Sequence, residues 1–359
     1  MKMEKLFVDL PEHAYDIFFE KDFSSIGKAL AGINAPKKLL IVTDSNVEPL
    51  WYPALLKELT DYDTSVCVLP AGEENKNMDS ILRICTACYE HNMDRSSMIL
   101  ALGGGVVGDM AGFASAIYMR GIRFVQIPTT LLSQSDSSVG GKTGIDFLNG
   151  KNILGAFHQP ALVYMNVSTL KTLPKREFIS GMGEVIKHGM IRDADFFQYL
   201  SEHSEEIKQL DSDILIAMAN RNCQIKAEVV CSDEKENGLR AILNFGHTVG
   251  HAIESACNFT YTHGECVALG MLAIVLIAEK RGIINQQLLP MLKDILTKFD
   301  FPLCVALPDY AKILSFLKKD KKNRAGSIKF VIPKKIGEVD FASDIQDCEI
   351  INALDFISK

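Results

Sequence analysis

The chain lacks a surplus of positive charge and any long apolar run. It carries 38 Lys and Arg against 45 Asp and Glu among 359 residues, a formal net charge of −7. This balance argues against a general affinity for nucleic acid. No apolar stretch approaches the roughly 20 residues that a membrane-spanning helix needs. We therefore expect neither nucleic acid nor membrane as a partner.

Cysteine spacing typical of a metal knuckle is also missing. Nine Cys occur, and Cys85 and Cys88 form the one C-x-x-C pair. Their segment reads as a helix with both thiols near its buried side, which favours packing over redox chemistry. An odd number of Cys and no recognisable signal sequence lead us to expect a reducing cytoplasm. No internal repeat or low-complexity linker interrupts the chain.

The N-terminal half alternates short apolar runs with helical stretches. A hydrophobic content of 47% in 359 residues is enough for two cores. Four runs predict buried strands: Lys38–Thr43, Ser65–Leu69, Met98–Leu102 and Phe124–Ile127. This order predicts a Rossmann-like α/β domain with a mostly parallel sheet, spanning residues 1–172. Polar loops follow all four strands, at the edge where such sheets bind ligands.

The C-terminal half reads as mainly helical from about Pro174 onward. Long amphipathic stretches occur at Asp213–Val230, Val267–Lys280 and Leu288–Phe299, and Phe330–Ile332 reads as extended. We therefore predict an α-helical second domain over residues 173–359.

A glycine-rich turn follows the third predicted strand. Gly103–Gly105 and Gly108 allow the backbone to approach a pyrophosphate closely, although they do not match the spaced G-x-G-x-x-G fingerprint. Asp44, after the first strand, is placed to accept from a ribose hydroxyl. Glu73 and Lys76 follow the second strand. A purely structural turn is the alternative, but suitable groups at three strand ends favour a nucleotide site.

Histidines and one glutamate suggest a metal site in the second domain. His247 and His251 are four residues apart, so on a helix they share a face. His263 follows, and Glu184 stands upstream. Imidazoles with one carboxylate suit Zn²⁺ and its relatives, and three ligands would leave a position open. Spacing alone makes His251 a ligand by analogy with H-E-x-x-H helices. The alternative is a set of scattered surface histidines.

Cationic residues surround these segments in an otherwise acidic protein. Lys142, Lys151 and Asn152 lie on glycine-rich loops that could cradle a phosphate. Solvated loop charges are the alternative. Further cations flank candidate site segments: Arg120, Lys187, Lys226, Arg240 and the run Lys319–Lys322. We therefore expect an anionic substrate. Arg240 and Asn244 precede His247 on the same expected helix or at its entrance.

Several ordered blocks resemble the 3-dehydroquinate synthases, which belong to the sugar-phosphate cyclases. The resemblance covers essentially the whole chain. Its blocks are Gly103–Asp109, Tyr118–Gly121, Pro128–Leu132, Asp136–Thr143, Gly150–Asn152, Glu184–Lys187, Asp233–Gly238, Leu243–Glu254 and His263–Glu265.

The resemblance implies an NAD- and metal-dependent lyase of the shikimate pathway, which leads to aromatic amino acids. Its substrate is the phosphorylated sugar acid 3-deoxy-D-arabino-heptulosonate 7-phosphate, converted to 3-dehydroquinate and phosphate. The implied sequence is transient oxidation by NAD⁺, phosphate elimination, reduction, ring opening and intramolecular aldol closure. The family also implies zinc or cobalt as the metal, and a homodimer in which Arg120 could reach the neighbouring subunit.

The resemblance assigns roles by position. Metal ligands would be Glu184, His247 and His263, with His251 beside the substrate instead of on the metal. Catalytic residues would be Asp136, Lys187, Glu236 and His251. The substrate phosphate would be bound by Arg120, Lys142, Asn152, Asn244 and one of Lys319, Lys321 and Lys322, which we take to be Lys322. The substrate carboxylate would be bound by Lys226 and Arg240. Cofactor would be bound by Asp44, Asn46, Glu73, Lys76, Gly104, Gly105, Val106, Asp109, Thr129, Thr130, Leu132, Lys142, Lys151, Thr169 and Thr172.

Three rival functions remain open at this point. Sister cyclases, such as a 2-deoxy-scyllo-inosose synthase, use substrates without a carboxylate, so Arg240 and Lys226 favour the synthase. A metal-dependent glycerol or alcohol dehydrogenase needs few phosphate ligands. A catalytically silent NAD- and metal-binding regulator would be expected to lack ligands or lysines that this chain retains.

Overall fold

The computed structural model describes residues 4–11, 13–148, 150–234, 238–323 and 328–359, with the side chains of 319–323 left aside. The chain divides into two compact units. Unit 1 comprises Met1–Leu173 with Ser212–Ala227, and unit 2 comprises Pro174–Asp211 with Glu228–Lys359. The sequence-based boundary at 172/173 lies one residue from the first division. The sequence pattern gave no indication that Ser212–Ala227 belongs to unit 1.

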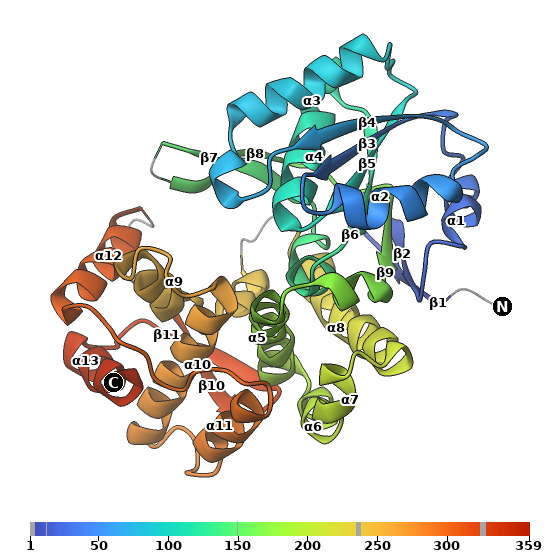
Figure 1. Cartoon of the computed structure of the whole chain (residues 1–359). Coiled ribbons are helices and arrows are strands. Elements are labelled where there is room, and N and C mark those ends of the chain that lie inside the picture. The colour runs from blue at the N-terminus through green and yellow to red at the C-terminus, as the bar shows by residue number, and fades with distance from the viewer. Residues whose placement is uncertain (1–3, 12, 149, 235–237, 324–327) are drawn as a thin grey trace. The chain divides into compact units, whose positions relative to one another are not determined.

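Unit 1 contains a seven-stranded sheet (Figure 1). Its strands, in spatial order, are β1 (Glu4–Val8), β2 (Tyr15–Glu20), β9 (Leu162–Asn166), β6 (Arg123–Pro128), β5 (Met98–Gly103), β3 (Lys38–Asp44) and β4 (Asp63–Leu69). All neighbours are parallel except β1 and β2. Asp44 pairs with Leu69 and Gly103 with Pro128, so the polar loops leave the sheet at one edge.

The sheet strands are apolar because helices cover both faces. In β3, Leu39 and Ile41 pack with α1 (Ile26–Gly32) and α2 (Glu48–Lys57). The alternate residues Leu40 and Val42 pack on the other face with α3 (Met78–Glu90) and α4 (Gly105–Ile117). Burial of both faces produces continuous apolar runs, which is why the sequence revealed these strands. The hairpin of β7 (Lys142–Phe147) and β8 (Gly150–Phe157) contacts α4.

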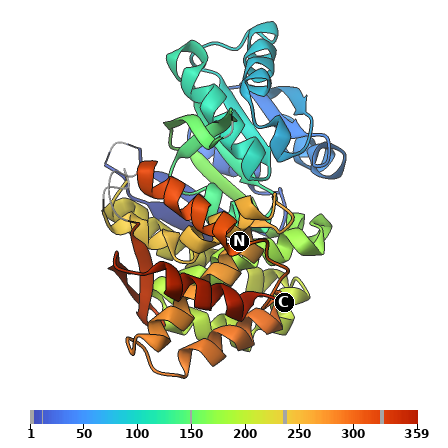
Figure 2. The ribbon, with the colours of Figure 1, turned by 90° about the vertical axis from the view of Figure 1, so that its left-hand side faces the viewer.

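Unit 2 is mostly helical, as predicted. Its helices are α5 (Lys175–Arg192), α6 (Ala194–Glu202), α7 (Ser204–Lys208), α9 (His247–Ala256), α10 (His263–Lys280), α11 (Leu288–Lys298), α12 (Tyr310–Asn323), α13 (Asp347–Ile357) and the end of α8 (Ser212–Ser232). Helix α10 is buried from Gly264 to Ala278 and contacts α5, α9, α11 and α13. In Figure 2 the helices of unit 2 are coloured from green through orange to red along the chain. The hairpin β10 (Phe330–Lys335) and β11 (Glu338–Ala342) includes the predicted extended segment.

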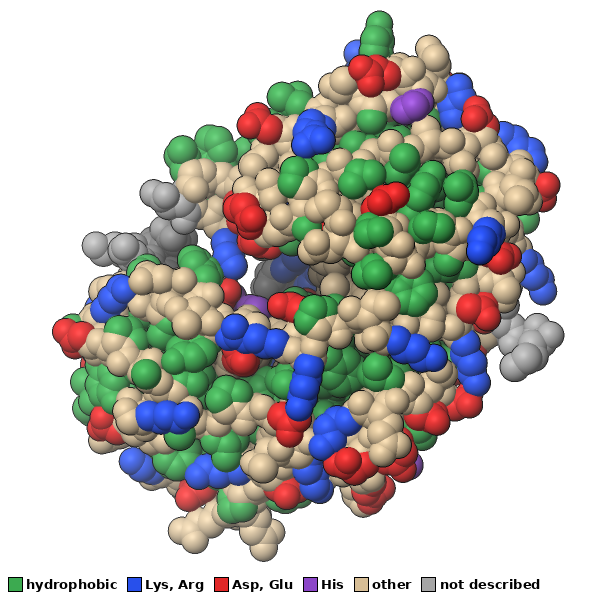
Figure 3. Space-filling model, viewed as in Figure 1, with side chains coloured by type: hydrophobic (Ala, Val, Ile, Leu, Met, Phe, Trp, Pro, Cys, Tyr) green, Lys and Arg blue, Asp and Glu red, His purple; other side chains and the backbone are tan. Residues whose placement is uncertain are grey.

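The described helices include none that is both long and apolar enough to cross a membrane. On the face shown in Figure 3, basic and acidic side chains are interspersed over the described surface. The fold is therefore a parallel-sheet α/β unit and a mainly helical unit, as the sequence predicted.

Candidate functional site

Three imidazoles of unit 2 come together at the starts of two helices. His247 is the first residue of α9, His251 lies one turn later, and His263 is the first residue of α10. Ring centroids lie 5.1 Å apart for His247 and His251, 5.2 Å for His247 and His263, and 5.6 Å for His251 and His263. Their ligand nitrogens lie within 4.8 Å of one another. His247 and His263 are 16 residues apart in the sequence, yet their ring nitrogens lie close enough together to bind one metal ion.

Glu184 of α5 adds a buried carboxylate to this cluster. Its Oε2 accepts a hydrogen bond from the Lys187 ammonium, and both side chains are 1% exposed. Its Oε1 lies 3.4 Å from Nε2 of His247 and 3.3 Å from Nε2 of His263. Oε1 accepts no hydrogen bond of good geometry from any described residue. Lys187 therefore holds one oxygen while the other points at two imidazole nitrogens.

The other ring nitrogens also have defined surroundings. Nδ1 of His247 lies 3.1 Å from the carbonyl oxygen of Phe245. Nδ1 of His263 lies 3.6 Å from Oε2 of Glu254, a mostly buried carboxylate. A partner at Nδ1 directs Nε2 toward a ligand, which is how metal-binding histidines are commonly oriented. Both Nε2 atoms consequently face Glu184.

Burial and neighbouring charges have opposing effects on the pKa values of His247, His263 and Glu184. Burial lowers the pKa of His247 to about 3, despite the nearby Glu184 carboxylate. Burial alone would also lower the pKa of His263, but Glu184 and Glu254 raise it to about 9. Lys187, His247 and His263 together overcome burial and lower the pKa of Glu184. The cluster therefore combines a buried carboxylate with the neutral imidazole of His247 and with His263, and these donor groups suit a divalent metal.

The start of α10 is clamped to α5, which places His263 beside Glu184. Thr262 and Glu265 form a capping box. Arg176 donates to both oxygens of Glu265, at 3.3 and 2.8 Å. The backbone N–H of Gly264 donates to Oγ of Ser180 at 3.0 Å. The two helices thus approach to backbone contact immediately beside the histidine.

In unit 1, the glycine-rich turn leads from β5 into α4. A Cβ on Gly104 would lie 3.0 Å from Cγ2 of Thr130, and one on Gly105 would lie 2.9 Å from Oγ of Ser137. The turn therefore has little room for side chains. Thr129 is buried, and its Oγ1 has no hydrogen-bond partner among the described residues. Such a polar atom beside a glycine turn and a helix N-terminus fits an anionic ligand with hydroxyls.

Other predicted cofactor residues take part in bonds within unit 1. Oδ1 of Asp44 accepts from the backbone N–H groups of Asn46 and Val47, at 2.8 and 3.1 Å. Oγ1 of Thr172 accepts from the Trp51 indole at 2.8 Å. Oγ1 of Thr169 accepts from the buried Gln134 amide and donates to the carbonyl of Asn166. Glu73 lies in the turn η1 (Glu73–Asn75), Val106 lies in the first turn of α4, and Leu132 precedes the π-helical turn η3 (Ser133–Ser137).

Lys76 and Asp109 form a buried ion pair at the same sheet edge. Nζ of Lys76 lies 2.7 Å from Oδ2 of Asp109, and Lys76 is 5% exposed. Burial raises the pKa of Asp109 to about 6, although Lys76 opposes the shift. Burial by itself would lower the pKa of Lys76, but the neighbouring carboxylates of Asp109 and Glu73 outweigh this effect and raise the pKa. The pair thus joins the predicted nucleotide loops of β4 and β5.

The predicted substrate residues of unit 1 are partly engaged with neighbours. Nζ of Lys226 lies 2.6 Å from Oδ1 of Asp136, on η3, and also donates to the Asp136 carbonyl. Lys142, Lys151 and Asn152 are exposed on the β7–β8 hairpin. Arg120 is exposed and has φ of 69°, in the left-handed region. A non-glycine residue held there is strained, which is common at functional sites.

The predicted substrate residues of unit 2 precede the histidine helix. Arg240 and Asn244 lie on the 3₁₀ turn η5 (Leu239–Asn244), and Gly246, with φ of 78°, separates this turn from α9. They therefore occupy the entrance of the helix. Arg240 is 3% exposed and donates to the carbonyl of Glu234 at 2.6 Å. Glu236 and the side chains of Lys319, Lys321 and Lys322 lie outside the described part.

Sequence reasoning missed several supporting residues. Glu254 lies three residues after His251 and seven after His247, a spacing that could have marked it as part of the same helix face. Thr262 and Glu265 carry the capping-box pattern directly at His263. The partnership of Arg176 with Glu265 had no such local signal, because 89 residues separate them.

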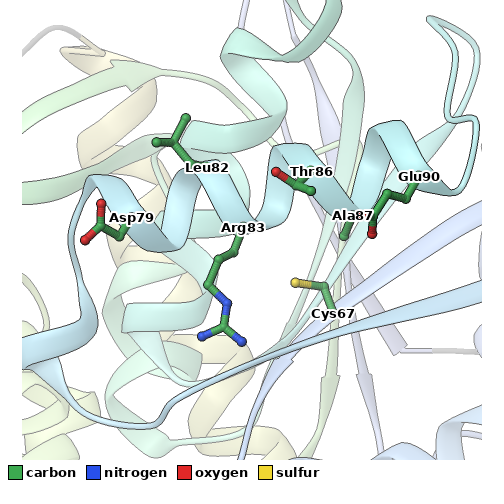
Figure 4. A pocket seen from close by; sticks show the side chains of 7 residues that line it. All are labelled: Cys67, Asp79, Leu82, Arg83, Thr86, Ala87 and Glu90. Atoms are coloured by element: carbon green, nitrogen blue, oxygen red, sulfur yellow. The ribbon is translucent and has the colours of Figure 1, made fainter.

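A separate pocket lies on α3 and β4 of unit 1 (Figure 4). Its lining includes Cys67, Asp79 and Arg83. The sequence predicted no site residue there, and the pocket adds nothing to the cluster described above.

Comparison with known proteins bears on the whole chain. The model of the 3-dehydroquinate synthase N-terminal region matches residues 66–180, and that of the C-terminal region matches residues 181–323. A 3-dehydroquinate synthase of Ruminiclostridium cellulolyticum is 46% identical over 96% of each chain. One of Acetivibrio thermocellus is 48% identical over 94% of each chain.

A solved structure is similar over nearly the same span. It is a 2-epi-5-epi-valiolone synthase of Streptomyces hygroscopicus subsp. jinggangensis with NAD⁺ and Zn²⁺ bound. The two chains are 28% identical, with a TM-score of 0.88 over 96% of this chain and 97% of that one.

Proposed function

The chain belongs to the 3-dehydroquinate synthase family, and from that premise we propose that it converts 3-deoxy-D-arabino-heptulosonate 7-phosphate to 3-dehydroquinate and phosphate. The structural observation that carries the proposal is the convergence of Glu184 Oε1 with Nε2 of His247 and of His263. Relatives that match over almost their whole length carry the synthase name, which favours this reaction over that of a sister cyclase.

The metal would be held by Glu184, His247 and His263. The fit rests on the buried Oε1 of Glu184, which accepts no good hydrogen bond from the part of the chain that the structure describes, and on two Nε2 atoms within 3.4 Å of it. Nitrogen and carboxylate donors suit Zn²⁺ or Co²⁺. His251 is exposed beside them, and we assign it to the substrate. Lys187, through its bond to Oε2, keeps the carboxylate turned toward the imidazoles.

NAD⁺ would be held by the loops at the carboxyl edge of the unit 1 sheet. Gly104, Gly105 and the start of α4 offer backbone N–H groups to a pyrophosphate. Thr129 contributes a buried hydroxyl. The remaining proposed contacts are Asp44, Asn46, Glu73, Lys76, Val106, Asp109, Thr130, Leu132, Lys142, Lys151, Thr169 and Thr172. When bound, NAD⁺ supplies a reversible hydride acceptor and the metal supplies Lewis-acid polarisation of substrate hydroxyls.

The chain's own residues would bind the two anionic groups of the substrate and move its protons. We assign phosphate binding to Arg120, Lys142, Asn152, Asn244 and Lys322, and carboxylate binding to Lys226 and Arg240. A guanidinium suits the planar carboxylate because it can donate two parallel hydrogen bonds. Asp136 is held by Lys226. Asp136, Lys187, Glu236 and His251 are the proposed proton-handling residues.

The proposed function is tested by product stoichiometry. The protein is incubated with Zn²⁺, catalytic NAD⁺ and 3-deoxy-D-arabino-heptulosonate 7-phosphate, while phosphate and reduced cofactor are followed together. Phosphate released in excess of the supplied NAD⁺, without net reduced cofactor, is the expected result. Release only from glucose 6-phosphate or sedoheptulose 7-phosphate would assign the chain to a sister cyclase. Steady NAD⁺ reduction by a simple polyol would assign it to a dehydrogenase.

A pair of histidine variants tests the metal ligands. His263→Ala should abolish phosphate release and Zn²⁺ binding, because it removes one of three ligands. His203→Ala, which removes a histidine at the end of α6, should leave both unchanged. Equal Zn²⁺ affinity in the two variants would exclude His263 as a ligand.

We further propose a homodimer in the cytoplasm. All nine cysteines are free thiols, which suits a reducing compartment. Light scattering coupled to size-exclusion chromatography gives the number of chains directly, and a mass near 39.7 kDa would identify a monomer.

A further inference from the structure

The β7–β8 hairpin of unit 1 contains a wide irregularity. Ile145 pairs with Leu154, but the next pair is Phe147 with Gly150. Asp146 alone on β7 therefore stands opposite the three residues 151–153 of β8. Such bulges re-aim side chains and often lie beside functional sites. Lys151 and Asn152, both proposed site residues, lie within this bulge.

Asp146 fixes the backbone of the bulge. Its Oδ1 accepts a hydrogen bond from the backbone N–H of Asn152 at 2.7 Å. Its own N–H donates to the carbonyl of Lys76 at 2.9 Å. Asn152 has φ of 54°, a left-handed conformation that asparagine tolerates better than most residues. Asp146 thus links the two strands of the bulge through Asn152 and links the bulge to the loop after β4 through Lys76.

Lys76 holds the side chain of the same asparagine. Its Nζ lies 2.6 Å from Oδ1 of Asn152 and 2.7 Å from Oδ2 of Asp109. An ammonium only donates hydrogen bonds, so the atom of Asn152 that it meets is the carbonyl oxygen. The amide NH₂ group of Asn152 is therefore directed away from Lys76, with two N–H donors suited to an anion.

We propose that Asp146 is the positioning residue that sets the bulge conformation in which Asn152 presents its amide to the substrate phosphate. The inference rests on the proposed function, because it takes the phosphate as the ligand of Asn152. Asp146 acts through a hydrogen bond accepted by Oδ1, and its charge is not required. Asparagine at this position keeps that acceptor oxygen, whereas alanine removes it.

The test compares Asp146→Ala with Asp146→Asn. The alanine variant should raise KM for 3-deoxy-D-arabino-heptulosonate 7-phosphate about tenfold and weaken inorganic phosphate binding by a similar factor, which corresponds to about 1.4 kcal/mol. Its kcat should fall less than its KM rises. The asparagine variant should stay within about twofold of wild type in both. Zn²⁺ affinity, measured by titration, should be the same in all three proteins.

Hydrogen exchange separates this inference from the proposed function. Amides of 150–157 should exchange faster in Asp146→Ala than in wild type and Asp146→Asn, whatever reaction the enzyme catalyses. Wild-type KM and phosphate affinity in Asp146→Ala would overturn the inference, as would equal impairment of both variants. A wild-type protein that releases no phosphate from the substrate, with the exchange pattern as expected, would overturn the proposed function instead.

Discussion

Replacement of Gly264 by alanine should damage the proposed metal site without changing any of its proposed ligands. A Cβ at this position would lie 1.9 Å from the carbonyl oxygen of Ser180 and 2.6 Å from its carbonyl carbon. These are backbone atoms of α5, so no flexible side chain can move aside. An acceptable contact needs at least 3.0 Å. The two helices must therefore separate by about 1.1 Å in Gly264→Ala.

That displacement is large compared with what a metal site tolerates. His263 is the neighbour of Gly264, and Glu184 lies one turn beyond Ser180 on α5. Ligand distances in a metal site are kept within about 0.2 Å. We expect Zn²⁺ affinity to fall at least tenfold, or about 1.4 kcal/mol. Forced overpacking should also lower the free energy of unfolding of the metal-free protein by about 1–3 kcal/mol.

The assay measures Zn²⁺ affinity by competition with a chelating dye and metal-free stability by urea unfolding in chelator. Gly32→Ala is the matched control, because its added Cβ has no atom of the described residues within 4 Å and Gly32 ends the helix α1. The control should bind Zn²⁺ normally and lose no stability. Wild-type Zn²⁺ affinity together with wild-type stability in Gly264→Ala would refute the argued backbone contact.

Two further predictions concern other carboxylates of unit 2. Glu254→Gln should weaken Zn²⁺ binding roughly 10–100-fold, because the carboxylate beside Nδ1 of His263 orients this proposed ligand. An unchanged Zn²⁺ affinity in the variant would mean that Glu254 does not orient His263. Arg281 holds both oxygens of Glu349, at 2.6 and 2.7 Å, and lowers the pKa of Glu349 to about 2. The stability from this pair is fully present above the ordinary carboxyl value near pH 4.5 and is lost as the pH falls toward 2. In urea unfolding at pH 7, the free energy of unfolding of the wild type should exceed that of Glu349→Gln by about 1 kcal/mol, after allowance for solvent screening. Near pH 2 the two proteins should have almost the same free energy of unfolding. A difference that does not change with pH would contradict this assignment.

Much of unit 1 could be predicted from local pattern. The four expected strands correspond to β3, β4, β5 and β6. The observed strands are longer by one residue in β3 and β5 and by two residues in β4 and β6. They were recognisable because helices bury both faces of the sheet, which makes the strands continuously apolar. The glycine turn before α4 was visible for a related reason, since its backbone lies too close to neighbours such as Thr130 for a side chain.

The candidate metal cluster was only partly predictable. The spacing of His247 and His251 indicated a shared helix face, and the structure has both on α9. Spacing alone favoured His251 as a ligand and gave no sign that Glu184 would lie beside these histidines, because the position of Glu184 depends on how α5 packs against α10. Only the packed helices bring Glu184 Oε1 to 3.3 Å from His263.

The strands, the principal helices and the residue types available for chemistry could be recognised in the sequence, because they follow from periodicity over a few neighbouring residues. Which of these residues meet depended on tertiary packing. It joined Ser212–Ala227 to unit 1, brought Lys76 to Asn152 across 76 positions, and set Glu254 behind His263. These contacts depend on packing between distant segments, and short-range periodicity carries no record of that packing.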